Sequence, residues 1–171
     1  MKKILNALFL TLLAVFTFSS CSDVPAPYDI LGEGDVPGLS GDGTKENPYS
    51  IEAVQKKQDG TIAWAEGYIV GTIENYQDPS GSAKFAAPFT ASNNLLIAAS
   101  ATETNVKNCV VVQLSSGTEL LTKLNLVNNA ANLGHVRAIQ GSLEKFYGFP
   151  GVKSTTAATL DGKDVGAVSY T

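Results

Sequence analysis

Residues 61–73 read TIAWAEGYIVGTI, a run of apolar, strand-forming residues that Gly67 and Gly71 interrupt. Branched and aromatic side chains favour a strand, and a glycine inside a strand indicates a bulge or a sharp bend. We therefore expect a first strand that bends at Gly67, with a bulge needing a positive φ there, so that one strand can serve two sheets. Such a strand is typical of a small closed β-barrel.

Four further stretches downstream predict the remaining strands of this barrel. Residues 95–99 form a short apolar run. In residues 108–114 (NCVVVQL), Val110, Val112 and Leu114 alternate with Cys109, Val111 and Gln113. Residues 135–144 form a fourth strand with a bulge at Gly141, although its inward face is ambiguous, and residues 152–160 form a fifth of β-branched character. The segment DVGAVSY in the tail could add an edge strand.

Two short helices are expected beside these strands. Ser50 is placed to cap a helix over IEAVQKKQ, and Ser116 with Glu119 fits a capping box for a helix over residues 117–124. The second helix falls between the third and fourth strands. We therefore predict an all-β fold with one or two short helices, a five-stranded OB-fold-like Greek-key barrel.

Length and charge narrow the possible functions. A chain of 171 residues is long enough for one domain, and its 12 basic and 16 acidic residues give a formal net charge of -4, which is not the basic footprint of a nucleic-acid-binding protein. Two lysines lie in residues 1–20 and five acids in residues 22–43, so residues 44–171, with 10 basic and 11 acidic residues, are close to neutral. An anionic ligand is therefore not excluded.

The N-terminal residues predict export and attachment to a membrane. Residues 1–20 have two lysines followed by an apolar core and small residues, which is typical of a signal peptide. The segment FSSC ending at Cys21 resembles the lipobox of bacterial lipoproteins, which implies lipidation of Cys21, although Phe18 departs from that pattern. Residues 21–43, acidic and rich in Pro and Gly, predict a disordered tether, followed by an OB-fold-like domain over residues 44–171 with its core at about 48–160.

Several blocks of the chain resemble a known family. The blocks are CSDVPAPYDI, GDGTKENPYSIEAV, EGYIVG, NLLIAAS, the NC before VVVQL, NLGHV and GSLEKFYGFPGVKS. Together they look like the uncharacterised OB-fold lipoprotein family of Bacteroidota. The resemblance implies a lipid-anchored OB-like barrel in the cell envelope, on the outer membrane and either surface-exposed or facing the periplasm, and it implies no activity.

Two aromatic loops are the candidate binding site. The loop between the first and second strands carries Tyr76 and Lys84 with Phe85 and Phe89, and the loop between the fourth and fifth carries Phe146 and Tyr147 with Phe149. Lys145 and Lys153 flank the second loop. OB-folds bind ligands at these two loops, and exposed rings stack on bases or sugars. The ligand-binding residues predicted here are Tyr76, Lys84, Lys145, Phe146, Tyr147 and Lys153; the alternative is that the rings pack against the barrel.

Catalysis finds little support in the sequence. His135 is the single histidine and is expected at an exposed strand edge, and Cys109 is expected to be a buried apolar residue, so neither a metal site nor a catalytic triad is predicted. Asp42, Thr44 and Glu46 alternate as calcium ligands do, but a polar turn is the better interpretation. No cofactor is expected.

We predict a non-catalytic lipoprotein that binds an extracellular polymer, a glycan or a nucleic acid, through its aromatic loops. The alternatives are a structural subunit that contacts an envelope protein partner, and an enzyme that uses the scattered acids Glu66, Glu74, Asp78 and Glu144.

Overall fold

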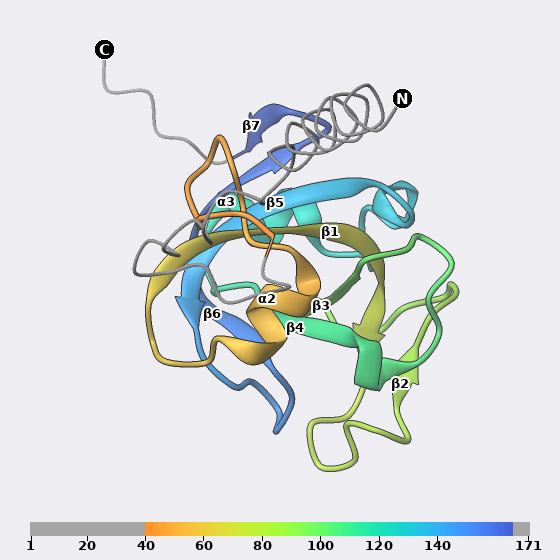
Figure 1. The fold of residues 1–171 in the computed structure, drawn as a ribbon. Coiled ribbons are helices and arrows are strands. Elements are labelled where there is room, and N and C mark those ends of the chain that lie inside the picture. Colours follow the sequence, from red (N-terminus) through yellow and green to blue (C-terminus); the bar gives the residue numbers. More distant parts are fainter. Residues whose placement is uncertain (1–39, 166–171) are drawn as a thin grey trace, which may run out of the picture. The chain divides into compact units, whose positions relative to one another are not determined.

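The computed structural model describes residues 40–165, which form one sheet of seven strands with two short α-helices (Figure 1). The strands are β1 (Ile62–Ile73), β2 (Ala83–Lys84), β3 (Asn94–Ala98), β4 (Cys109–Gln113), β5 (Val136–Leu143), β6 (Gly151–Leu160) and β7 (Lys163–Val165). The helices are α2 (Ile51–Lys56) and α3 (Glu119–Leu124), with 3-10 helices η1 (Val106–Asn108) and η2 (Ala130–Asn132). The predicted all-β class with short helices is confirmed. The predicted leader, Cys21 and the tether up to residue 39 lie outside the described residues, as do residues 166–171 of the tail.

Five of the strands pair in a ring. β1 pairs with β3, β3 with β4, β4 with β6, β6 with β5, and β5 again with β1, while α3 falls between the third and fourth strands of this ring. This is the predicted OB-fold-like order. The ring is weakest between β4 and β6, which run parallel and share two residue pairs. Gln113 strengthens that seam, because its side chain accepts a hydrogen bond from Ser154 N at 3.0 Å and its carbonyl accepts one from Thr155 Oγ1 at 2.7 Å.

The long first strand arches around the ring and changes partners midway (Figure 1). Tyr68 lies opposite Val136 of β5 on one side and opposite Ala98 of β3 on the other. The predicted positive φ at Gly67 is wrong, and so is the bulge there, because the register shifts between Ile69 and Gly71. Gly67 serves close packing instead. A Cβ at this position would lie 2.6 Å from Ile51 Cδ1 and 3.0 Å from Ala98 O.

Both faces of β3 and β4 are buried, which accounts for their continuous apolar sequences. Alternate residues, such as Ile97 and Val110, point into the inner core with Ile69 and Ile139. The intervening residues form a second cluster on the outer face: Val70, Ile73, Leu96, Ala98, Val106, Cys109 and Val111. Four aromatic side chains of the two loops pack on this outer cluster: Phe85, Phe146, Tyr147 and Phe149. The loops therefore cover the strands that an OB-fold commonly offers to its ligand.

The two helices begin at capping residues, one of which differs from the prediction. Ser50 caps α2 as expected, with its hydroxyl accepting from Ala53 N at 3.3 Å. The cap of α3 is Thr118, which accepts from Leu121 N at 3.1 Å, so the predicted capping box at Ser116 is wrong by two residues. The cause is local: Gly117 has a φ of 76°, which keeps the chain out of the helix until Thr118. A membrane-crossing helix, which would have to be long and apolar, does not occur in residues 40–165.

β5 carries the predicted bulge and a buried charge that was not predicted. Its register with β6 shifts between Gln140 and Ser142, which confirms the bulge at Gly141. Arg137 is completely buried. Its Nη2 donates to Asn132 Oδ1 at 3.0 Å and its Nη1 to Val136 O at 2.6 Å, with Asp161 Oδ1 at 3.6 Å. Burial lowers the pKa of Arg137, an effect that Asp161 opposes.

Candidate functional site

The β5–β6 loop, residues 144–150, contains a tight two-residue turn with a tyrosine in an unusual place. Phe146 and Phe149 exchange both backbone hydrogen bonds, at 2.9 and 3.1 Å, while Tyr147 and Gly148 between them have φ of 52° and 81°. Two positive φ values define a type I′ turn, whose first central position favours Asn, Asp or Gly. A bulky ring there is costly, so this turn holds Tyr147, half-buried against the outer cluster, at the expense of backbone strain.

The loop between β1 and β3 is held in place by one carboxylate. Glu74 accepts hydrogen bonds from Thr90 N at 2.9 Å and Ala91 N at 3.0 Å, and also from the Thr90 hydroxyl. Phe89 is buried in the inner core, and β2 pairs with the end of β1. This long loop is thus anchored at both ends, and it carries Tyr76 with 65% of its surface exposed.

These two loops meet at three aromatic side chains, Tyr76, Phe146 and Tyr147, which we call the aromatic rim. The ring centroids of Phe146 and Tyr147 are 4.0 Å apart in a stacked arrangement, and those of Tyr76 and Tyr147 are 6.3 Å apart at 33°. Asn93 Nδ2 donates to the Tyr147 hydroxyl at 3.0 Å. The rim therefore offers the exposed ring of Tyr76 and the half-buried rings of Phe146 and Tyr147 beside amide and hydroxyl groups that can hydrogen-bond.

The structure brings together some of the six predicted ligand-binding residues but not all of them. It brings together Tyr76, Phe146 and Tyr147, from segments some 70 residues apart in the chain. Lys145 is exposed beside Phe146, Lys84 is half-buried in β2 opposite Thr72, and Lys153 pairs with Glu144 at 3.4 Å. Among residues 40–165 the cation–π contact found joins Lys45 to Trp64, not a predicted lysine to the rim.

Asn93, which lies beside the aromatic rim, was not predicted from the sequence. Its neighbour Asn94 is buried and bonds both the amide and the carbonyl of Ile73, at 2.7 and 2.9 Å, which fixes the start of β3 beside the end of β1. Asn93, one residue earlier, is thereby held next to Tyr147. The Asn-Asn pair before an apolar run was the available signal, and it was interpreted as loop composition.

The remaining polar candidates have structural partners. His135 is half-exposed, and its Nδ1 lies 2.9 Å from Asp161 Oδ2. Cys109 is buried, and burial raises the pKa of its thiol to about 12, so little reactive thiolate exists at neutral pH. Asp42 accepts from Thr44 N and Oγ1, at 2.9 and 2.7 Å, in the polar turn that was predicted. Residues 40–165 contain no group of three or more His, Cys, Asp or Glu side chains placed to hold a metal ion.

The fold and the rim together define a class, a small all-β domain with an OB-fold-like strand order whose two aromatic loops meet over one face of the sheet. The chain belongs to the family described as Domain of unknown function (DUF6359), whose model matches residues 49–161. That match begins just before α2 and ends at Asp161, so it spans the whole ring of strands. It agrees with the resemblance to an uncharacterised family. No curated protein and no solved structure matches the chain.

Proposed function

We propose that this protein is a non-catalytic binding module that holds a glycan chain on its aromatic rim. The observation that carries the proposal is the convergence of Tyr76, Phe146 and Tyr147 from two loops, with Tyr147 held at a positive φ. A backbone strain that keeps a ring half-exposed is easier to account for by a ligand than by packing alone. Exposed tyrosine rings stack on the apolar faces of sugars, and Asn93 and the tyrosine hydroxyls are suited to bond sugar hydroxyls.

The charges around the rim favour a glycan over a nucleic acid. A strand of nucleic acid needs a track of cations for its phosphates. Lys153 is already paired with Glu144, and Lys84 is half-buried, which leaves Lys145 as the exposed lysine of the three that were predicted. Asp78 and Glu74 lie on the same loop as Tyr76. The local balance of charge is therefore close to neutral.

Three of the four scattered acids, Glu74, Asp78 and Glu144, are arranged as structural groups, which supports a role without catalysis. The Glu74 carboxylate holds Thr90 and Ala91, and Asp78 Oδ1 accepts from Gly81 N at 3.0 Å. Glu144 accepts from Ser142 Oγ and pairs with Lys153. These three carboxylates thus have their own local partners, and of the four acids only Glu66 has none among the described residues. Acid–base chemistry on a substrate needs carboxylates that face a shared space.

We further propose that the module is displayed from a membrane by lipid on Cys21, as expected for a Bacteroidota outer-membrane lipoprotein. The basis is the leader, the FSSC segment and the acidic tether in the sequence. Metabolic labelling with a palmitate analogue tests this point. Label should enter the parent chain and be absent from Cys21→Ser.

The glycan proposal is tested by affinity electrophoresis of the full chain through gels containing different polysaccharides, at low and high salt. At least one polysaccharide should retard the parent, with little effect of salt. Tyr76→Ala should reduce the retardation by roughly tenfold in Kd, because a stacked ring contributes about 1–3 kcal/mol. Ile62→Ala is the matched control, since Ile62 is 70% exposed at the other end of β1. Its retardation should equal that of the parent.

Other outcomes contradict the proposal in identifiable ways. Binding to oligonucleotides that falls steeply with salt indicates a nucleic-acid module. A single stoichiometric protein partner, captured equally by the parent and by Tyr76→Ala, indicates the structural subunit instead.

A further inference from the structure

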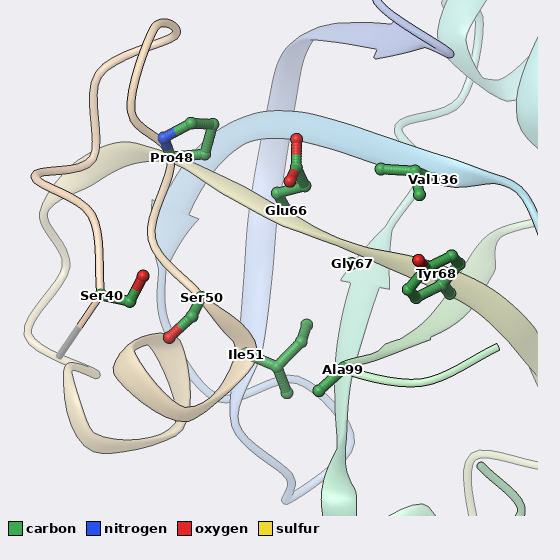
Figure 2. Close-up of a pocket in the computed structure, with 9 residues that line it drawn as sticks. All are labelled: Ser40, Pro48, Ser50, Ile51, Glu66, Gly67, Tyr68, Ala99 and Val136. Atoms are coloured by element: carbon green, nitrogen blue, oxygen red, sulfur yellow. The ribbon is translucent and has the colours of Figure 1, made fainter. Parts of the chain in front are cut away.

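A second candidate site lies away from the aromatic rim, where β1 changes partners. Before Gly67 the edge of β1 bonds to the segment that enters α2, with Glu66 N donating to Tyr49 O at 2.9 Å. After Gly67 the same edge pairs with β3, starting at Tyr68 opposite Ala98. A pocket of about 240 Å³ lies between these two partners (Figure 2).

Gly67 lies at the centre of the residues around this pocket in Figure 2. Ile51 packs so closely beneath it that a Cβ on Gly67 would lie 2.6 Å from Ile51 Cδ1. Pro48, Ala99 and Val136 supply further apolar surface. The size is below the ~300–1,000 Å³ of pockets for drug-sized ligands, so one small ring or chain is the most that fits.

The polar groups around the pocket are those of an acceptor-rich site. They are the Glu66 carboxylate and the hydroxyls of Ser40, Ser50 and Tyr68. Ser50 Oγ accepts from Ala53 N at 3.3 Å, while no other described residue hydrogen-bonds the side chains of Ser40, Glu66 or Tyr68. No Lys or Arg lines the pocket. An ionised carboxylate only accepts hydrogen bonds, so the matching ligand is a donor, and a cation fits better than an anion.

We propose that this pocket is a second binding site, which takes a small hydroxylated amine about the size of one hexosamine. Glu66 holds the ammonium group, the serine and tyrosine hydroxyls meet the ligand's hydroxyls, and Ile51 with Val136 contacts its apolar face. The site uses none of the rim residues, so it does not depend on the proposed glycan function.

The test is a titration of the full chain with glucosamine at mildly acidic pH, followed by ¹H–¹⁵N NMR. Amide shifts should concentrate at Ser50, Gly67 and Ala99. Glucose matches glucosamine in size but lacks the charge. Because Glu66 is exposed, glucose should bind about two- to fivefold more weakly, the factor expected for a solvent-exposed ion pair. N-acetylglucosamine, whose nitrogen is uncharged, should behave like glucose.

Three variants locate the interaction. Glu66→Gln keeps the shape of the side chain and should lose the preference for glucosamine over glucose, whereas Glu119→Gln, an exposed acid on α3, should keep it. Ala99→Phe should abolish binding of both sugars by filling the pocket. Tyr147→Ala should leave the titration unchanged, so that failure at this pocket can be told from failure at the rim.

Two results would overturn the proposal. One is an absence of shifts at the pocket with glucosamine while the spectrum shows a folded protein. The other is equal binding of glucose and glucosamine, which would remove the role given to Glu66.

Discussion

The two ends of the β5–β6 strand pair differ in the kind of side chain that they hold and in how deeply it is buried. At one end the strands are joined by the hairpin of Phe146 and Tyr147, whose rings are half-buried and stacked. At the other end Arg137 is completely buried and bonded to Asn132, beside Asp161. Half-buried rings can be exchanged at little cost to folding, whereas a buried guanidinium cannot lose its partners cheaply. We expect this difference to separate the part of the molecule that maintains the fold from the part that is proposed to bind.

The largest expected effect is at the buried end. Arg137→Ala should lower the free energy of unfolding by about 3 kcal/mol or more, because it leaves a cavity and removes donors from Asn132 Oδ1 and Val136 O. Urea denaturation followed by fluorescence of Trp64 measures this. Arg137→Met, which fills much of the same space, should lose less. A loss below about 1 kcal/mol for Arg137→Ala would mean that this end does not maintain the fold.

The next effect tests whether that end acts as a unit. Asn132→Ala should cost about 2 kcal/mol, because Asn132 Nδ2 also donates to Lys123 O at 2.9 Å and its loss leaves Arg137 Nη2 unpaired. In a double-mutant cycle with Arg137→Ala, the double variant should lose about 1 kcal/mol less stability than the sum of the two single losses. Full additivity would show two independent contacts instead.

The loops at the aromatic end were easier to predict from the sequence than the contacts at the buried end. Apolar alternation and turn residues predicted the strands, and the OB-fold-like order then predicted that the loops carrying Tyr76 and Tyr147 lie together. Arg137 was not predicted to be buried, because the alternation along its strand left the inward face ambiguous and a charged residue is rarely buried without a partner. Only the packing of η2 places Asn132 within reach of it.

The position of the bulge in β1 and the geometry of the β5–β6 turn were also beyond the sequence. Gly67 and Gly71 were both possible bulge sites, and the choice depends on how closely Ile51 and Lys84 approach β1, which are contacts from distant segments. A Cβ at Gly71 would lie 2.1 Å from Lys84 O. The positive φ of Tyr147 is similarly hidden, since residue preferences for a type I′ turn argue against tyrosine.

A smaller effect on stability is expected at the aromatic end. Tyr147→Asn should change the free energy of unfolding by less than about 1 kcal/mol, because relief of the positive φ offsets the lost stacking on Phe146. Binding to the polysaccharide identified by electrophoresis should nevertheless fall strongly. Tyr147→Phe, which keeps the ring, should retain most of the binding. A loss of several kcal/mol in Tyr147→Asn would make the ring part of the core and remove the contrast between the two ends.

The smallest effect concerns the ion pair at the aromatic end. Hydrogen bonds from Ser142 and Lys153, together with the charge of Lys153, lower the pKa of Glu144. A carboxylate whose pKa is lower in the folded state stabilises the fold above its unfolded pKa of about 4.3, and this contribution is lost as the pH falls through the folded value. Glu144→Gln should therefore slightly flatten the acid side of a plot of melting temperature against pH.

The difference in melting temperature between Glu144→Gln and the parent should depend on pH. At neutral pH Glu144→Gln should melt slightly below the parent, and at a pH well under the folded pKa of Glu144 the two should coincide, because the parent carboxylate is then protonated as well. Glu46→Gln, at an exposed acid in the polar turn, serves as the control for loss of one negative charge. Half-exposed Lys153 and Glu144 are screened by salt, so the difference should shrink at high ionic strength. A difference as large as that of Arg137→Ala would show that the aromatic end also maintains the fold, and the rim could then not be varied independently of stability.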